Sequence, residues 1–290
     1  MTNSSLSDST SSLWKDAWYR LLKNRLAVFG GAFLGFEILI CILTPWIAPH
    51  GFEIQNLEFT LAKPSLTHWF GTDSLGRDLF TRILYGVRIS MTVGILASLV
   101  SVIVGVLYGA VSGFIGGRTD SILMRIVDIL YALPFIFLVI ILMVYFGRNI
   151  LLLFVALGLT QWLTMARIVR GQVMSIKQKE FVEAAKSMGV KTHTIILKHL
   201  IPNTLGPVIV YLTLTVPSVI LEEAFLSFLG LGVQAPMASW GTLISSGVEV
   251  MEIAPWVLVF PATMLSLTLF SLNFLGDGLR DALDPKGAKD

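Results

Sequence analysis

Long apolar runs alternate with shorter polar segments along this chain. Runs long enough to cross the roughly 30 Å hydrocarbon core of a bilayer as helices occur at 26–48, 90–114, 122–146, 150–168, 205–229 and 253–275. Because backbone groups inside lipid must be satisfied within the protein, each run is predicted to be helical. The pattern therefore predicts an all-α integral membrane protein with six transmembrane helices.

The polar segments predict how these spans are connected. Residues 1–25 are expected to form a cytoplasmic tail and a basic amphipathic segment, and 279–290 a cytoplasmic tail. Residues 49–86 read as a non-cytoplasmic loop, and 87–278 as a core of five spans interrupted by a polar loop at 171–203.

Composition and charge agree with a membrane protein of defined orientation. With 54% hydrophobic and 14% charged residues, the chain differs from soluble domains, in which about 25% of residues are charged. Of the 21 lysines and arginines, six spans with both termini inside place 16 in the cytoplasm and five outside. That distribution follows the positive-inside bias.

The polar loop 171–203 is predicted to contain two helices. Strong helix formers without a breaker favour a helix from Glu180 to Met188, and Gly189 permits a left-handed helix end. A second short helix is expected to stop before Pro202. Apolar and small side chains at helical spacing would form one face of the first helix, suited to close approach by another protein. An ordinary amphipathic helix at the membrane surface is the alternative.

The sequence Glu183-Ala184-Ala185, with Gly189 and Pro202 in register, resembles the EAA loop of ABC-importer permeases. His199 and Ile201 stand where the usual pattern has isoleucine and leucine. In that family the loop fits a groove on the cytoplasmic ATPase. The residues implied in coupling are Glu180, Glu183, Ala184, Ala185, Gly189, His199 and Pro202.

A second resemblance lies before the core. Residues 70–73, 76–78 and 86–90, with Arg82, are similar to the segment that precedes the core in C-type subunits of oligopeptide and dipeptide permeases. The glycines and aspartates there also suit tight turns in which Arg77 and Arg82 pair with acids.

The resemblance extends from about residue 12 to 286 and implies a type I importer permease with a MetI-like core. It implies a homologous B-type permease, two cytoplasmic ATPases that bind ATP and Mg²⁺, an extracytoplasmic peptide-binding protein, surrounding membrane lipid and a bacterial inner-membrane location. The chain would be a non-catalytic translocation subunit for oligopeptides. Importers of dipeptides, nickel or peptide antibiotics share much of the pattern, and nothing indicates a nucleic-acid partner.

Glycine recurs at every fourth position near the end of the second span. Gly105, Gly109, Gly113 and Gly117 would share one face of a helix, where small residues let neighbouring backbones approach closely. These four residues are therefore predicted to form a packing stripe.

Several acids fall within or beside the spans. Glu222 and Glu223 lie near an expected helix break, and either a contact with substrate or a structural role is possible for each. Glu37, inside the first span, is a functional candidate that also suits a subunit contact or snorkelling. Arg125 and Asp128 are expected to pair within one helix.

Two other classes of function remain possible. An ion-coupled secondary transporter would use Glu37, Asp128 or Glu222, but no internal repeat of spans is apparent. A structural membrane anchor would use the polar loop only as a scaffold.

Catalytic motifs are absent from the sequence. There is no phosphate-binding Gly-x-x-x-x-Gly-Lys-Ser/Thr loop and no His-Glu-x-x-His motif. No cofactor or metal site is therefore expected in this chain, and its four histidines all fall outside the spans.

Overall fold

The structure is a computed structural model that describes residues 13–147 and 149–283, and in these ranges it is helical without a β-strand. The remaining parts of the expected tails lie outside the described residues. The elements are α1 (Leu13–Lys23), α2 (Arg25–Ile47), the 3₁₀ turn η1 (Leu57–Phe59), α3 (Leu79–Ile115), α4 (Gly117–Ala132), α5 (Phe135–Phe146), α6 (Ile150–Ile176), α7 (Glu180–Ser187), α8 (Thr192–Ile195), the π-helix η2 (Ile196–Leu200), α9 (Ile201–Phe228), α10 (Trp240–Glu249) and α11 (Trp256–Leu283).

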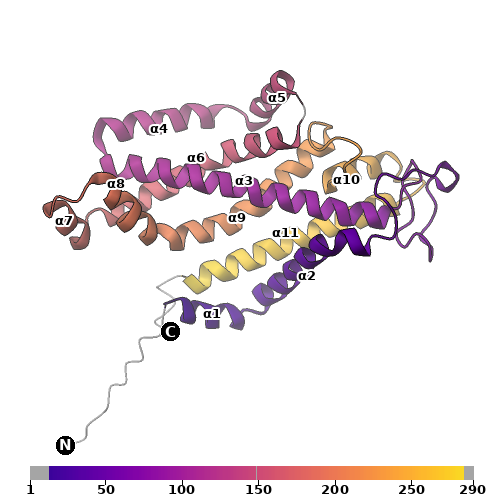
Figure 1. The fold of residues 1–290 in the computed structure, drawn as a ribbon, viewed down its shortest axis with the longest axis horizontal. Helices are drawn as coiled ribbons and strands as arrows, with labels where there is room; N and C mark the ends of the chain where they lie inside the picture. The colour runs from indigo at the N-terminus through magenta and orange to yellow at the C-terminus, as the bar shows by residue number, and fades with distance from the viewer. Residues whose placement is uncertain (1–12, 148, 284–290) are drawn as a thin grey trace, which may run out of the picture.

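The long helices form an elongated bundle with two distinct ends (Figure 1). One end carries α1, α7, α8 and the last turns of α11, and we call it the coupling end. The opposite, outer end carries α10 and the connection between α2 and α3. Within the described residues, five helices, counting α8, η2 and α9 as one, are long and apolar enough to cross a membrane, and the bent pair α4–α5 gives a sixth if the pair is counted as one span.

The third expected span is broken. Helices α4 and α5 meet at an angle of 85°, whereas residues 122–146 were expected to form one helix with at most a kink. Proline disfavours helical conformation in the residue before it, and Leu133 is extended, with φ −77° and ψ 128°. Pro134 is the N-cap of α5 rather than a continuation of α4.

Two helices run beyond the apolar segments from which they were predicted. Helix α3 begins at Leu79, not near residue 90, because the carboxylate of Asp78 accepts the backbone N–H of Thr81 at 2.8 Å and caps it. Helix α6 continues to Ile176, past the expected end near residue 168. With 37 residues, α3 is about 55 Å long at 1.5 Å per residue, so it extends past the hydrocarbon core.

The glycine stripe accounts for the close contact between α3 and α6. A Cβ atom at Gly105 would lie 2.6 Å from the Cβ of Met165, and one at Gly113 would lie 2.8 Å from the carbonyl oxygen of Arg170. A Cβ atom at Gly109 would meet the backbone of α6 at Ala166 and Arg170. The expectation that Gly117 shares this face is wrong: α3 has ended, and Gly117 begins α4 with φ 56° and open space around it.

The connection before α3 is organised by Asp73. Its carboxylate accepts the backbone N–H of Leu75 and Arg77, binds Arg77 Nε at 2.7 Å, and lies 3.5 Å from Arg82 Nε. The predicted pairing of both arginines with an acid is confirmed. Since Asp73 is buried, these bonds give a segment with little regular structure a fixed shape.

Helix α1 packs on the end of α11. Ala17 and Leu21 form a small core with Ala27 and Ala282. The first and last described helices therefore meet at the coupling end of the bundle, as Figure 1 shows.

Candidate coupling surface and membrane acids

Helices α7 and α8 are separated by a glycine turn at the coupling end. Gly189 has φ 73°, and its N–H donates to the carbonyl of Lys186 at 2.9 Å. The N–H of the next residue, Val190, donates to the carbonyl of Ala185 at 3.1 Å. Together these bonds form a Schellman motif, which satisfies the last carbonyls of α7 and favours glycine at the left-handed position.

Pro202 does not stop the second helix. Residues 192–228 run as one continuous path through α8, η2 and α9. The widened π-turn explains this: Ile201 N–H bonds the carbonyl of Ile196, five residues back. A π-turn shifts the hydrogen-bond register, so the missing N–H of Pro202 falls where the register changes.

One face of α7 is buried in the bundle and the other is exposed. Val182 and Ala185 are 0% and 2% exposed and join a core built from α6, η2 and α9. Ala184, expected to share a face with Ala185, is exposed instead, because neighbouring helical residues point about 100° apart. The exposed face also carries Glu180 and Glu183.

This exposed face has charges without partners. Across residues 13–147 and 149–283, no hydrogen bond or ion pair engages the carboxylate of Glu180 or Glu183. Gly189 and Pro202 are exposed as well, and His199 is half-buried with its carbonyl accepting from Asn203 at 2.6 Å. We refer to Glu180, Glu183, Ala184, Met188 and Gly189 as the α7 surface.

Two lysines, one at the end of α6 and one in α7, contact the end of α3. Lys177 Nζ donates to the carbonyl of Gly113 at 2.8 Å, near the C-terminal end of α3, where a cation is favoured. Lys186 Nζ lies 5.0 Å from the centre of the Phe114 ring, within cation–π distance. The end of α6 and the end of α7 are therefore both held close to the end of α3.

Glu223 is a structural acid at the outer half of the bundle. It is 0% exposed, and its carboxylate accepts hydrogen bonds from Ser90 on α3 at 3.0 Å and Ser227 at 2.6 Å. Ser90 Oγ in turn accepts the N–H of Trp240 at 3.3 Å. This network joins α3, α9 and α10.

Glu222 points in a different direction, towards α6. Its Oε1 accepts from Gln161 Nε2 at 2.6 Å, whereas Oε2 is enclosed without a partner. The helix is unbroken at both acids, and α9 ends only at Phe228. Of the two, only Glu222 has a buried carboxylate oxygen without a hydrogen-bond partner among the described residues.

Glu37 faces its own chain. It is 0% exposed on α2, and its Oε1 accepts from Thr268 of α11 at 2.5 Å. Of the alternatives left open by the sequence, snorkelling does not fit this buried contact between α2 and α11.

The expected pair of Arg125 and Asp128 does not form. Asp128 instead binds Arg167 of α6 at 2.8 Å. Asp120 accepts two bonds from Arg170, both 2.6 Å long. Both pairs cross from α4 to α6, so they hold the first half of the broken span.

Sequence reasoning missed contacts made by residues far apart in the chain. Gln161 meets Glu222 across 61 residues, and Ser90 meets Glu223 across 133. The only signal in the sequence was a polar residue inside each apolar run. That signal marks a residue that needs a hydrogen-bond partner but does not identify the partner.

A helical bundle with a broken span, a surface loop at one end and internal acids is the arrangement of a membrane transport subunit. A family model described as binding-protein-dependent transport system inner membrane component matches residues 105–289, and one described as the N-terminal TM domain of oligopeptide transport permease C matches 12–64. The chain therefore belongs to the family of ABC-importer permeases, multi-pass proteins of the inner membrane.

Relatives place the chain among the oligopeptide and dipeptide permeases of that family. It is 53% identical to the oligopeptide transport system permease protein OppC of Haemophilus influenzae over 95% of this chain and 89% of the relative. It is 51% identical to the dipeptide transport system permease protein DppC of Bacillus subtilis over 94% and 85%.

A solved structure supports the same fold. An inward-facing MetNI methionine ABC transporter superposes with a TM-score of 0.56 at 20% identity, covering 71% of this chain and 96% of that one. The MetI-like core predicted from sequence is thereby confirmed. The family models and the relatives favour a permease subunit over a secondary transporter or a membrane anchor.

Proposed function

We propose that this chain is the C-type permease subunit of an ATP-driven oligopeptide importer and that the α7 surface docks on a cytoplasmic ATPase. The observation that carries the proposal is the division of α7 into a buried face that anchors it and an exposed face with unpaired carboxylates. The exposed face is available to a partner, and the burial of the opposite face fixes the orientation of α7.

The implied assembly contains a homologous permease, two ATPases that bind ATP and Mg²⁺, and an extracytoplasmic peptide-binding protein. The coupling end then lies in the cytoplasm, together with both termini. This chain contributes no catalytic group and no cofactor, because nucleotide hydrolysis belongs to the partners.

Movement of the docked ATPase would be transmitted through η2 into α9. Glu222, with one unpaired carboxylate oxygen beside α6, is the residue that we assign to the translocation pathway. Glu223 holds the neighbouring helices in place. Oligopeptides are proposed over dipeptides because the N-terminal match is to the oligopeptide permease C domain.

Docking is tested with substitutions on the exposed face. Glu183→Lys and Ala184→Arg place a cation and bulk on the α7 surface without entering the core. In the assembled transporter in vesicles, both variants are expected to lose ATPase co-purification and peptide uptake while retaining the partner permease. Glu53→Lys, an exposed acid at the outer end, is the matched control for ATPase retention.

The outcome against the proposal is retention of the ATPases by both α7 variants with unchanged uptake. Substrate class is measured in the same vesicles by competition between tripeptides or tetrapeptides and dipeptides. Exclusive uptake of dipeptides would replace oligopeptide with dipeptide in the assignment and leave the docking proposal intact.

A further inference from the structure

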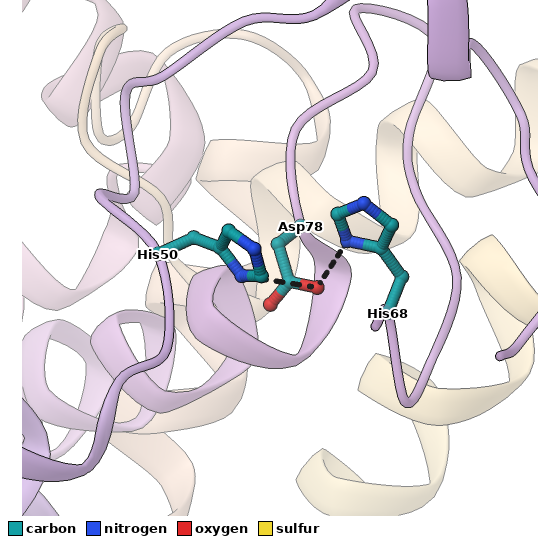
Figure 2. Close-up of side chains that lie close together, drawn as sticks. All are labelled: His50, His68 and Asp78. Atoms are coloured by element: carbon teal, nitrogen blue, oxygen red, sulfur yellow. Dashed lines mark hydrogen bonds and ion pairs between the residues drawn. The ribbon is translucent and has the colours of Figure 1, made fainter. Parts of the chain in front are cut away.

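Three metal-ligating side chains converge at the outer end, beside the start of α3 (Figure 2). His50 follows α2, His68 lies in the connection, and Asp78 caps α3. The Nδ1 atoms of His68 and His50 lie 2.9 Å and 3.9 Å from the same oxygen, Oδ1 of Asp78. One ligand atom from each of the three residues falls within 4.8 Å of the others.

We propose that His50, His68 and Asp78 bind a divalent transition metal ion, with Zn²⁺ as the best match. Imidazole nitrogen and carboxylate oxygen are zinc ligands with bonds near 2.0–2.2 Å, which places ligands of one tetrahedral ion about 3.3 Å apart. The distances of 2.9 Å and 3.9 Å lie on either side of that value. Two imidazoles select against Mg²⁺ and Ca²⁺, which prefer oxygen ligands.

A hydrogen bond alone accounts for only half of the arrangement. His68 is within hydrogen-bond distance of Asp78, but His50 is not, and the two rings stack with centroids 5.0 Å apart. A shared cation explains why both Nδ1 atoms lie near a single carboxylate oxygen.

The surroundings of Asp78 suit a ligand held in place. Its Oδ2 accepts the N–H of Thr81 at 2.8 Å, so Oδ1 is left for the two histidines. Such an outer bond orients a ligating carboxylate. The Asp78 side chain is 1% exposed and His50 is 39% exposed, and a cavity of about 310 Å³ adjoins them. There is room for water as a fourth ligand.

Bound metal would cross-link the segment after α2 to the first turn of α3. The connection that holds this site lies at the opposite end of the bundle from the α7 surface (Figure 1), so the test of metal binding does not require ATPase docking. No metal site was expected from the sequence, which lacks a His-Glu-x-x-His motif and has all four histidines outside the predicted spans.

The test uses the full chain in detergent, purified without a polyhistidine tag and stripped with a chelator. Zn²⁺ bound after equilibrium dialysis is measured by elemental analysis, and Co²⁺ serves as the spectroscopic probe. We expect one Zn²⁺ per chain, a visible Co²⁺ spectrum of tetrahedral type, and a higher unfolding temperature with Zn²⁺.

The double variant His50→Gln/His68→Gln is expected to weaken binding by more than about 100-fold, since even partners of ligands contribute about 10- to 100-fold. Asp78→Asn keeps an oxygen to cap α3 but removes the charge, and it too should lose Zn²⁺. His193→Gln, at an exposed histidine of α8, is the matched control and should bind normally.

Equal Zn²⁺ binding by the wild type and the double variant overturns the proposal. So does a wild-type chain that binds no Zn²⁺ while remaining folded. Unfolding temperatures without metal establish that each variant is folded, so loss of binding is not mistaken for loss of structure.

Discussion

The packing of α3 against α6 makes Gly109 sensitive to the smallest possible enlargement. A Cβ atom at Gly109 would meet the carbonyl oxygen of Ala166 and lie 3.0 Å from both the backbone nitrogen of Arg170 and the Cβ of Val169. Backbone atoms cannot rotate away as a side chain can. Gly109→Ala therefore requires the two helices to separate.

The cost follows from two opposing effects. Overpacking typically destabilises by about 1–3 kcal/mol, whereas alanine in place of glycine in a helix gains about 1 kcal/mol. The expected net loss for Gly109→Ala is about 1 kcal/mol, roughly a fivefold shift of the folding equilibrium. A Cβ atom added at Gly171, in α6, would have no neighbouring atom within 4 Å. Gly171→Ala should therefore show only the gain in helix propensity.

The two variants are compared by reversible unfolding in mixed micelles. We expect them to differ by about 2 kcal/mol, with Gly171→Ala the more stable. If Gly109→Ala is at least as stable as Gly171→Ala, the close contact between α3 and α6 is not as described. Gly109→Leu should enlarge the loss, because more atoms enter the same contact.

Three further predictions use the same unfolding measurement or hydrogen exchange. Glu223→Ala removes the acceptor of two serine hydroxyls and should cost about 2–4 kcal/mol, with Glu223→Gln costing less; equal losses would contradict the network. Asp120→Asn should lower the free energy of unfolding by about 1–2 kcal/mol, and Arg170→Lys by a similar amount because lysine lacks the bidentate geometry. An Arg170→Lys variant as stable as the wild type would argue against a stabilising role for the two bonds between Arg170 and Asp120. Lys186→Met should speed amide exchange in α7 by removing a cation–π contact of about 0.5–1 kcal/mol, and unchanged exchange would show that the contact does not hold α7.

Most spans were predictable because a bilayer imposes a length and polarity that hydropathy reports directly. The consequences of individual prolines were not. Pro134 separates two helices by 85°, while Pro202 lies inside a continuous path because a π-turn precedes it. Both have the same local chemistry, and the outcome is decided by how neighbouring helices satisfy the backbone.

The candidate coupling surface was partly predictable from local pattern. The glycine at the end of α7 has the left-handed conformation that its residue type favours. The division between Ala184 and Ala185 depended on which side of α7 meets the core, and adjacent alanines carry no such information. The histidines near Asp78 lie in irregular chain, where no period relates one residue to another.

The contacts described here imply how motion at the coupling end would reach the outer end, if α7 docks the ATPase as proposed. The path 192–228 is continuous, so η2 and α9 would carry a displacement along one helical path rather than through a loop. At one end, Lys177 and Lys186 fasten the coupling segment to α3. At the other, Glu223 fastens α9 to α3 and α10 through Ser90. The two lysines join the ends of α6 and α7 to α3, and Glu223 joins α3 to α9 and α10. Helix α3 is therefore the element held at both ends, and a displacement of α7 would act on α3 as well as on α9.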